Sequence, residues 1–381
     1  MISKYCFSAL FVCLLGFVQA QTTVSGSFVH GGITRTYSFY VPASYTPGNP
    51  VPMVIGLHGL SSSGADFAEN RDFRPIADTA NFIMVHPDGS TMFGVRFWNY
   101  ENILGSTVDD VGFLEALIDT IAASYSINSA RIYCTGMSNG SFMAYLLACR
   151  SNRFAAIGTV TGSMSVDMYD ECVPAQPIPV LHIHGTDDST NPYEGTSTMK
   201  GIDETSLFWV DQNNCNPVPA VSSIPDINTS DNATATRYVY SGGINGHTVE
   251  LFKINGGGHS WPGWPVSGSS GNTCMDFDAT KEIWRFFSQY ELNTLASQTN
   301  KKTVEVSFWP NPASKEITVQ AADNYLITEI SISDLQGRLI ETKTGKNLQF
   351  IRLDYLKAGN YLLKISGDNF TVSKKLVIQN Y

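Results

Sequence analysis

The chain has few charged residues and no excess of positive charge. Asp, Glu, Lys and Arg make up 15 % of its 381 residues, and 34 acidic side chains outnumber 24 basic ones, for a formal net charge of −10. Proteins that bind nucleic-acid phosphates or an anionic membrane surface need a dense basic patch, and none occurs here. We therefore expect no nucleic-acid partner and a neutral substrate.

Long hydrophobic runs are missing outside the first twenty residues. There, Lys4 precedes an apolar run over 7–18, and Ala20 provides a small residue for a cleavage site before Gln21. The run is shorter than the ~20 residues that a membrane-spanning helix needs. Residues 1–20 are therefore predicted to be a signal peptide, so we expect an exported protein without a membrane span in its mature form.

Cysteine is scarce, and two of the seven, Cys6 and Cys13, belong to the predicted signal peptide. An exported protein can oxidise the five that remain, and their odd number leaves at least one unpaired. Cys134 lies in an apolar strand run, where a buried free thiol is expected. We predict that Cys172 and Cys215 pair.

The arrangement of apolar runs predicts two domains. Hydrophobic residues reach 43 % and aromatic ones 12 %, enough for a sizeable core. After a hairpin-like start over 22–41, short strand-like runs alternate with helix-like runs up to residue 290. This alternation indicates an α/β fold with a mostly parallel sheet covered by helices on both faces. The polar tract 292–303 is predicted to be a linker between domains 21–291 and 304–381, and the second domain shows only strand-like runs, as in a small all-β sandwich.

A candidate nucleophile lies in the middle of the first domain. Residues 136–140 read Gly-Met-Ser-Asn-Gly, which matches the G-x-S-x-G nucleophile elbow around Ser138. The motif is weak by itself, but an apolar strand run over 132–134 leads into it and a helix-like run over 142–148 follows it. Such a sharp strand-to-helix turn needs small residues beside the serine. Ser138 is therefore predicted to be the nucleophile of an α/β-hydrolase site.

A base and an acid follow in the chain order of this fold, Ser then Asp then His. His259 comes after a Gly-Gly-Gly sequence that follows the last core strand, and it is the predicted base. The acid is expected in the sequence His-Gly-Thr-Asp-Asp at 184–188, where Asp187 and Asp188 are alternatives. His182 and His184 share one face of a strand, which favours packing or a role behind the acid over a metal site.

The oxyanion hole of such a site needs two backbone N–H groups. We expect one from Asn139, directly after the nucleophile, and one from Leu60 in the loop after the strand run 54–57. His58 is interpreted as a structural anchor of that loop. The resulting mechanism is acyl transfer through Ser138, and it requires no metal and no cofactor.

Residues 27–290 resemble the esterase family that groups polyhydroxybutyrate depolymerase-like enzymes with the feruloyl and acetylxylan esterases of carbohydrate esterase family 1. The matching segments are Leu-His-Gly at 57–59, His-Pro-Asp-Gly at 86–89, Asp-Asp-Val-Gly-Phe at 109–113, the elbow at 136–140, His-Gly-Thr-Asp-Asp at 184–188 and Gly-Gly-His-Ser-Trp-Pro-Gly at 257–263. The His-Gly-Thr-x-Asp spacing of that family implies Asp188 as the acid. The chain departs from the family at Ser141, where a second glycine is common.

The C-terminal domain resembles the sorting domain of the type IX secretion system. The segments that carry the resemblance are Trp-Pro-Asn-Pro-Ala at 309–313, Ile-Ser-Asp-Leu-Gln-Gly-Arg at 332–338 and Leu-Lys-Ala-Gly-Asn-Tyr at 356–361. The resemblance implies a bacterial protein that contacts the secretion machinery, is secreted or held at the cell surface, and loses this domain.

Aromatic residues in the predicted active-site loops are candidates for substrate binding. Trp98, Tyr193, Trp261 and Trp264 could stack on a sugar, a feruloyl ring or a polyester, or could pack the loops instead. Three functions follow: a secreted esterase on feruloyl or acetyl esters of plant polysaccharide, a depolymerase of a polyhydroxybutyrate-type or aromatic polyester, or a surface binding protein without turnover. In the first two, the partner is a polymeric or oligomeric ester.

Overall fold

The computed structural model describes residues 21–264, 270–292, 306–322, 325–334, 339–367 and 370–379. The predicted signal peptide and most of the predicted linker lie outside these residues. The chain divides into two compact units, Met1–Asn293 and Thr294–Tyr381. Among the described residues, no helix has the length and apolar character to cross a membrane.

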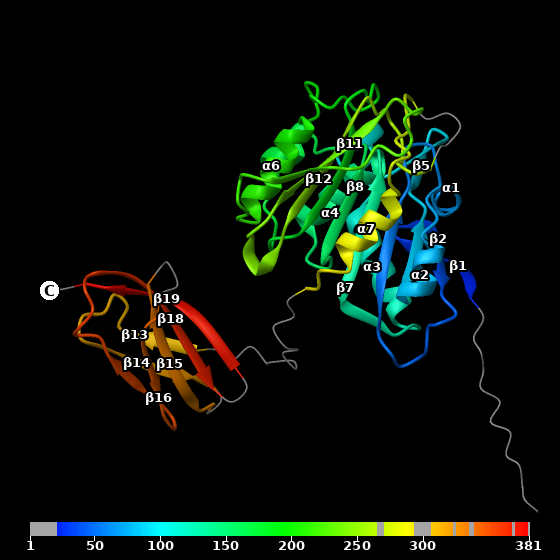
Figure 1. Ribbon diagram of the computed structural model, residues 1–381. Helices are drawn as coiled ribbons and strands as arrows, with labels where there is room; N and C mark the ends of the chain where they lie inside the picture. Colours follow the sequence, from blue (N-terminus) through cyan, green and yellow to red (C-terminus); the bar gives the residue numbers. More distant parts are fainter. Residues whose placement is uncertain are drawn as a thin grey trace, which may run out of the picture. The chain divides into compact units, whose positions relative to one another are not determined.

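The first unit is built on a sheet of ten strands (Figure 1). In sheet order they are β1 (Thr22–His30), β2 (Ile33–Val41), β4 (Ile83–Pro87), β3 (Val51–Leu57), β7 (Ile127–Met137), β8 (Ala156–Val160), β9 (Val180–Gly185), β12 (Val249–Asn255), β11 (Thr234–Tyr240) and β10 (Ala220–Ser223). The six central strands from β4 to β12 are parallel, whereas β1, β2, β10 and β11 pair antiparallel. Strands β3, β4 and β9 are buried along their whole length, as expected between two helical layers.

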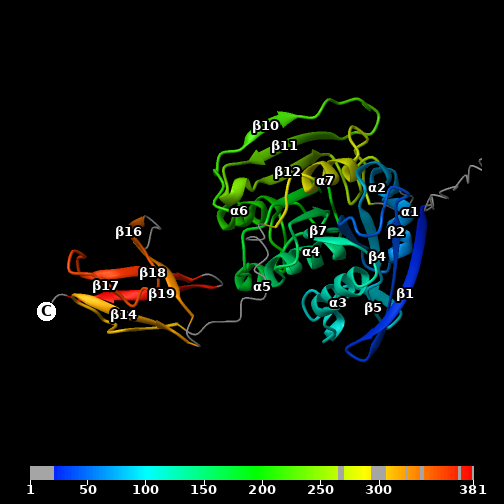
Figure 2. The same cartoon turned by 90° about the horizontal axis from the view of Figure 1, so that it is seen from below.

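Helices cover both faces of this sheet (Figure 2). One face packs against α3 (Asp110–Ala122), α4 (Asn139–Arg150) and α6 (Ile202–Gln212), and the other against α1 (Gly64–Asn70), α2 (Arg74–Ala80) and α7 (Ala279–Phe287). Shorter elements are α5 (Val166–Glu171), the hairpin of β5 (Ser90–Met92) and β6 (Val95–Phe97), and the 3₁₀ turns Ile103–Gly105 and Ile244–Gly246. The predicted α/β fold with a mostly parallel sheet is therefore confirmed.

Local sequence explains where several helices begin. The carboxylates of Asp109 and Asp278 accept hydrogen bonds from backbone N–H groups in the first turns of α3 and α7, which satisfies donors that a helix leaves unpaired. Helix α4 differs, because every residue from Asn139 to Cys149 is buried. A helix that is buried on all sides belongs to the interior of the fold, and α4 begins directly after Ser138.

The disulfide differs from the prediction. Cys149 at the end of α4 bonds to Cys172 after α5, with a Cα–Cα distance of 5.2 Å, and Cys215 is a buried free thiol, as are Cys134 and Cys274. The predicted pair of Cys172 and Cys215 is wrong because the chain returns from α5 to the end of α4, whereas Cys215 packs beyond α6 with its Sγ 3.5 Å from the backbone oxygen of His247. The free, buried state of Cys134 agrees with the prediction.

The second unit consists of two small antiparallel sheets. One contains β13 (Val306–Trp309), β14 (Glu316–Ala321) and β17 (Phe350–Arg352), and the other β16 (Leu339–Thr344), β15 (Ile327–Ser333), β18 (Gly359–Gly367) and β19 (Phe370–Ile378). The strict alternation of buried and exposed residues along β14 is that of a strand with one face on a core. Both sheets contribute to one apolar cluster, as expected for a small all-β sandwich.

Candidate active site

The turn between β7 and α4 holds Ser138 in an unusual backbone conformation. Its φ is 55° and its ψ is −121°, a region that costs a non-glycine residue roughly 1–3 kcal/mol and that persists where the surroundings enforce it. The Ser138 N–H donates to the backbone oxygen of Val160 in the neighbouring strand (2.9 Å). The predicted strand, turn and helix around Ser138 are all present.

Glycine is required on both sides of the serine because backbone segments approach very closely. A Cβ atom on Gly136 would lie 2.3 Å from the backbone oxygen of Gly140, and one on Gly140 would lie 2.2 Å from that of Leu57. Ser141, where the family commonly has glycine, finds room, and its hydroxyl bonds to Gly136 O and to the backbone of Val160 (2.8 Å each). The departure at Ser141 therefore adds hydrogen bonds between the elbow and two strands.

His259 lies on the loop that follows β12. Its backbone N–H donates to Ser270 O (2.6 Å), and the loop can pass there because a Cβ on Gly258 would lie 2.1 Å from that same oxygen. The imidazole Nδ1 of His259 donates to Asp188 Oδ2 at 2.8 Å. The other ring nitrogen, Nε2, is thereby left as the proton acceptor that a general base needs.

Asp188 follows β9 and is buried, with only 3 % of its surface exposed. Its Oδ1 accepts the backbone N–H groups of Thr190 (2.9 Å) and Asn191 (2.8 Å). Burial by itself raises the pKa of this carboxyl, but hydrogen bonds from His184 and His259 outweigh that effect and hold the pKa well below its usual range. Asp187 instead accepts from the Thr186 hydroxyl (3.1 Å), so the hydrogen bond to His259 distinguishes the two aspartates.

A chain of buried side chains extends behind Asp188. His184 Nε2 donates to Asn191 O (2.8 Å) and lies 3.4 Å from Asp188 Oδ2. His184 Nδ1 then accepts from His182 Nε2 at 3.1 Å, and His182 Nδ1 faces the hydroxyl of Tyr145 in α4. Burial and the neighbouring His184 lower the pKa of His182 well below its ordinary value.

This chain gives the paired histidines a structural explanation. Their ring nitrogens bond to each other and to protein groups, which favours the predicted role behind the acid over metal binding. Tyr145, the far end of the chain, was not predicted. Its position inside a helix-like run gives no sign in the sequence that it meets a strand histidine.

The loop after β3, which contains Leu60, is held in place by the side chain of His58. His58 Nδ1 donates to Gly59 O (2.7 Å), and His58 Nε2 accepts from Gly89 N–H (2.9 Å). Because the C=O and N–H of a trans peptide point in opposite directions, fixing Gly59 O directs the Leu60 N–H away from His58. Burial lowers the pKa of His58 to about 4, so it is a neutral anchor at pH 7, in agreement with its interpretation as a structural residue.

The second predicted oxyanion donor, Asn139, is the first residue of α4, so its N–H has no acceptor within the helix. Its side chain is held by Trp98: Asn139 Oδ1 accepts from Trp98 N–H (2.7 Å), and Asn139 Nδ2 donates to Trp98 O (3.1 Å). The nucleophile turn and the loop around Trp98 are thus locked together.

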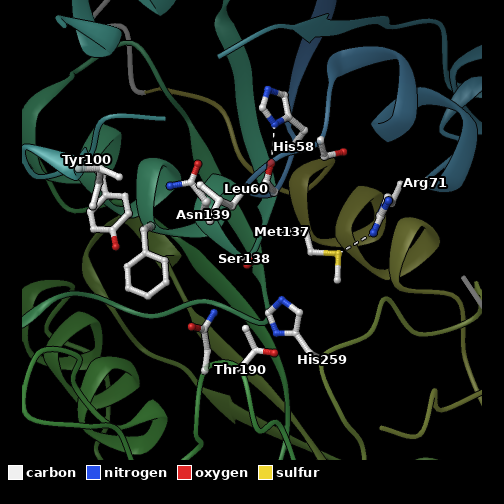
Figure 3. A pocket seen from close by; sticks show the side chains of 14 residues that line it. His58, Leu60, Arg71, Tyr100, Met137, Ser138, Asn139, Thr190 and His259 are labelled. Atoms are coloured by element: carbon white, nitrogen blue, oxygen red, sulfur yellow. Dashed lines mark hydrogen bonds between the residues drawn. The ribbon is translucent and has the colours of Figure 1, made fainter. Parts of the chain in front are cut away.

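These groups meet at a cavity of about 440 Å³. Figure 3 shows Ser138 and His259 near its centre, with Leu60 and Asn139 beside them. The described residues that line it are His58, Gly59, Leu60, Ser62, Arg71, Tyr100, Ile103, Met137, Ser138, Asn139, Phe142, Thr190, Asn191 and His259. The structure therefore brings the predicted nucleophile, base and both oxyanion donors to one cavity, with the predicted acid behind the base.

The aromatic lining of the cavity differs from the prediction. Trp98, Tyr193 and Trp261 are buried and do not line it. Their polar atoms serve loop packing: Trp98 Nε1 donates to His58 O (3.1 Å), the Tyr193 hydroxyl to Asp203 (2.6 Å) and Trp261 Nε1 to Thr280 (3.1 Å). As substrate-binding candidates these three are wrong, because their rings have no open face.

Tyr100 and Phe142 line the cavity in their place. Their rings stack with centroids 4.7 Å apart, and burial raises the pKa of Tyr100 to about 12. Neither belongs to a recognisable motif, so nothing in the sequence singled them out. Trp264 is half-buried and is absent from the described lining, so its binding role stays a prediction.

One group of potential metal ligands occurs among the described residues, formed by Asp231, Cys274 and Asp276. Its carboxylates already have other partners, since Asp276 Oδ1 accepts two backbone N–H groups, from Ile227 and Asn228. Asp231 likewise accepts a backbone N–H at each of its two oxygens. These bonds tie loops together, and none of the three residues lines the cavity at Ser138.

Two segments of the chain match models of known protein families. Residues 35–175 match the family described as esterase PHB depolymerase, and residues 307–379 match the secretion system C-terminal sorting domain. The predicted resemblance to both groups is therefore confirmed. The match to the sorting domain indicates a bacterial protein that is secreted or held at the cell surface.

Related proteins are carboxylic ester hydrolases. The chain is 24 % identical over 264 residues to a bifunctional acetylxylan esterase/xylanase of Neocallimastix patriciarum, covering 69 % of this chain but only 34 % of that protein. It is 24 % identical over 272 residues to feruloyl esterase D of Neurospora crassa, covering 68 % and 83 %. Among solved structures, acetyl xylan esterase from Aspergillus awamori has a TM-score of 0.47 at 15 % identity, covering 67 % of this chain and 94 % of that chain.

Proposed function

We propose that this relative of the PHB depolymerase-type esterases is a secreted serine esterase. The observation that carries the proposal is the single cavity at which Ser138, in a strained strand-to-helix turn, meets His259, whose Nδ1 is bound to the buried Asp188. These are the parts that acyl transfer to a serine hydroxyl requires.

In the proposed mechanism, Ser138 Oγ attacks the ester carbonyl while His259 Nε2 takes up its proton. The negative charge that develops on the carbonyl oxygen is stabilised by the N–H groups of Leu60 and Asn139. Protonated His259 then gives its proton to the leaving alcohol, and the acyl group stays on Ser138. Water, deprotonated by His259, attacks this acyl-enzyme. The bond between the acyl carbon and Ser138 Oγ then breaks, His259 returns the proton to Ser138 Oγ, and the acid is released.

Asp188 has two tasks in this mechanism. It keeps the His259 proton on Nδ1, and its negative charge stabilises the imidazolium that forms in each step. The hydrogen bonds that hold its pKa low keep it ionised at neutral pH.

The proposed substrates are feruloyl or acetyl esters of plant polysaccharide. Two relatives are named for these esters, and the stacked rings of Tyr100 and Phe142 offer an aromatic surface at the cavity. The alternative is a polyester of the hydroxybutyrate type, which the matched family description favours. A binding protein without turnover is a third candidate, and it would not need the strained backbone at Ser138.

Release of ferulate, acetate and hydroxybutyrate by the purified protein tests these candidates, with Ser138→Ala as the control. We expect wild type to release one of the acids, and the variant to lose at least about 10³-fold in kcat because the nucleophile is absent. Equal activity of both proteins would refute the catalytic assignment. No release from any ester, with polymer binding retained, would support the binding protein.

The proposal includes the processing of the chain. Residues 1–20 act as the signal peptide, 21–291 as the esterase domain, 292–303 as the linker and 304–381 as the sorting domain. Mass spectrometry of protein recovered from the culture medium tests this division, with Gln21 as the expected first residue. A recovered chain that still begins at Met1 would contradict the assignment of the signal peptide.

A further inference from the structure

Arg71 is a positive charge at the edge of the candidate active site, and among the described residues it has no negatively charged partner. It follows helix α1 and lines the same cavity as Ser138 and His259. Burial lowers the pKa of its guanidinium to about 10, which still leaves it protonated at neutral pH. It forms no ion pair with any described residue. A half-buried cation normally has a carboxylate beside it.

Protein groups leave most of the hydrogen-bonding capacity of Arg71 unused. Its Nη2 lies 2.8 Å from the sulfur of Met137, a weak acceptor. Its Nε is buried and has no partner among the described residues. Its guanidinium carbon lies 6.0 Å from the Trp261 ring centroid, at the outer limit of a cation–π contact. A guanidinium has five N–H donors, so these contacts satisfy little of it.

The acidic residues closest to Arg71 are either outside the cavity or bound to other groups. None of the described residues that line the cavity is Asp or Glu, although the whole chain has a formal net charge of −10. The carboxylate that most affects Arg71 belongs to Asp66, and it accepts hydrogen bonds from Ser62 (3.3 Å) and Ser63 (2.8 Å) instead. Nearby Arg74 shows the usual arrangement, with its Nε 2.7 Å from Asp72.

We infer that Arg71 is a specificity residue that binds a carboxylate of the substrate, so that the preferred esters carry a negative charge close to the scissile bond. The inference rests on the proposed esterase function and narrows its substrate class. It replaces the neutral substrate expected from the composition, because the local charge of the cavity is opposite to that of the whole chain. A guanidinium binds a carboxylate with two parallel, charge-assisted hydrogen bonds.

The cavity then has two chemically different sides. In the view of Figure 3, Tyr100 and Arg71 lie on opposite sides of Ser138. An ester bound across Ser138 would place an apolar or aromatic part against Tyr100 and Phe142 and its charged part against Arg71. Two polymers supply such a group: a polyester chain end carries a free carboxylate, and an acidic polysaccharide carries uronic acids.

Two matched pairs of esters test the inference and separate these sources. The first pair is a hydroxybutyrate dimer with a free carboxylate and its methyl ester. The second is an acetylated xylo-oligosaccharide that carries a uronic acid and the same compound with the uronate methylated. We expect wild type to cleave the charged member of one pair with roughly 10- to 100-fold higher kcat/KM, mostly through KM, which is the usual effect of hydrogen bonds to an ionised group.

Variants of Arg71 then show whether the preference for the charged ester depends on this side chain. Arg71→Gln should abolish it, and Arg71→Lys should retain part of it because the charge remains without the fork geometry. Arg74→Gln is the matched control, since Arg74 is outside the cavity, and it should keep the full preference. Thermal unfolding of each variant shows whether the fold is intact.

Two results would overturn the inference: equal kcat/KM for both members of each pair in wild type, or a preference that survives Arg71→Gln. Either would mean that Arg71 serves only to pack against Met137 and Trp261. Failure of the esterase proposal is a separate result, measured as equal cleavage of para-nitrophenyl acetate by wild type and Ser138→Ala.

Discussion

Replacing Asp188 by asparagine changes one atom of the site and tests how the acid controls His259. In the wild-type protein, Oδ1 accepts two backbone N–H groups, and Oδ2 accepts the proton of His259 Nδ1 at 2.8 Å. An asparagine has one acceptor atom and one NH₂ group. The two backbone donors fix the acceptor at the Oδ1 position, so the NH₂ group faces His259.

The alternative orientation is unfavourable. Turning the amide over would leave the N–H groups of Thr190 and Asn191 without an acceptor, at roughly 1–3 kcal/mol each. Changing the tautomer of His259 avoids that cost, because Nδ1 then accepts from the amide. The proton now sits on Nε2, the atom that must take the proton from Ser138. The more stable arrangement is therefore the inactive one.

The expected loss in kcat is about 10⁴-fold, the size of effect found when the acid of a catalytic triad becomes an amide. It corresponds to about 5.4 kcal/mol in the activation free energy. KM should change little, since Asp188 does not line the cavity. The assay is hydrolysis of para-nitrophenyl acetate under saturating conditions.

Asp187→Asn is the matched control, because its carboxylate bonds to the Thr186 hydroxyl and not to His259. It should keep kcat within about twofold, as expected of a group outside the reaction. Thermal unfolding checks that the Asp188→Asn variant is folded. The reasoning would be refuted if this folded variant retained more than about a tenth of the wild-type kcat, or if Asp187→Asn lost as much kcat as Asp188→Asn.

Three further predictions concern stability and the nucleophile turn. Gly140→Ala places a Cβ 2.2 Å from a backbone oxygen of β3, and the displaced turn should lower kcat/KM by about 10²-fold or more; an unchanged value would contradict the close contact. Burial lowers the pKa of both His58 and His86 to about 4. Their protons therefore bind more tightly in the unfolded chain, and stability should fall by about 1.4 kcal/mol per pH unit for each as pH drops from 6.5 toward 4. Urea unfolding at pH 7 and pH 5 measures this, and equal stabilities would show that the two imidazoles can accept protons in the folded state. Replacing Cys149 and Cys172 by alanine opens a loop with a sequence separation of 23 residues and should cost about 3 kcal/mol in the chain-entropy model; a loss of this size for Cys215→Ala instead would contradict the pairing.

The sequence predicted most of the fold because its central strands and helices carry strong local signals. The runs at β3, β4 and β9 are fully buried and apolar, and the helix-like runs at α3 and α7 begin at capping aspartates. Strands β10 and β11 were not predicted. Strand β10 is exposed along its whole length, so it lacks the buried positions from which strands are recognised.

The prediction of Ser138, Asp188 and His259 as a triad rested on a different kind of signal. The turn at Ser138 and the loop that carries His259 need glycine where two backbone segments approach closely. These glycines form a pattern that can be recognised in the sequence. Gly140 and Gly258 are examples, since a Cβ on either would lie within about 2.2 Å of a backbone oxygen. The choice of Asp188 over Asp187 depended on a family pattern, and in the structure it corresponds to a 2.8 Å hydrogen bond to His259.

Chain order, glycine positions and apolar periodicity thus predicted an α/β fold with Ser138 in a strand-to-helix turn, followed by a small all-β unit, whereas the sorting domain was predicted from its resemblance to a known family. Only the tertiary structure decided which side chains line the cavity at Ser138. Trp98 and Trp261 are as aromatic as Tyr100 and Phe142, yet the former are buried and the latter line the cavity. Arg71 becomes notable only because none of the described residues that line the cavity is acidic. Orientation and missing partners depend on contacts between distant segments, and such contacts leave no local pattern in the sequence.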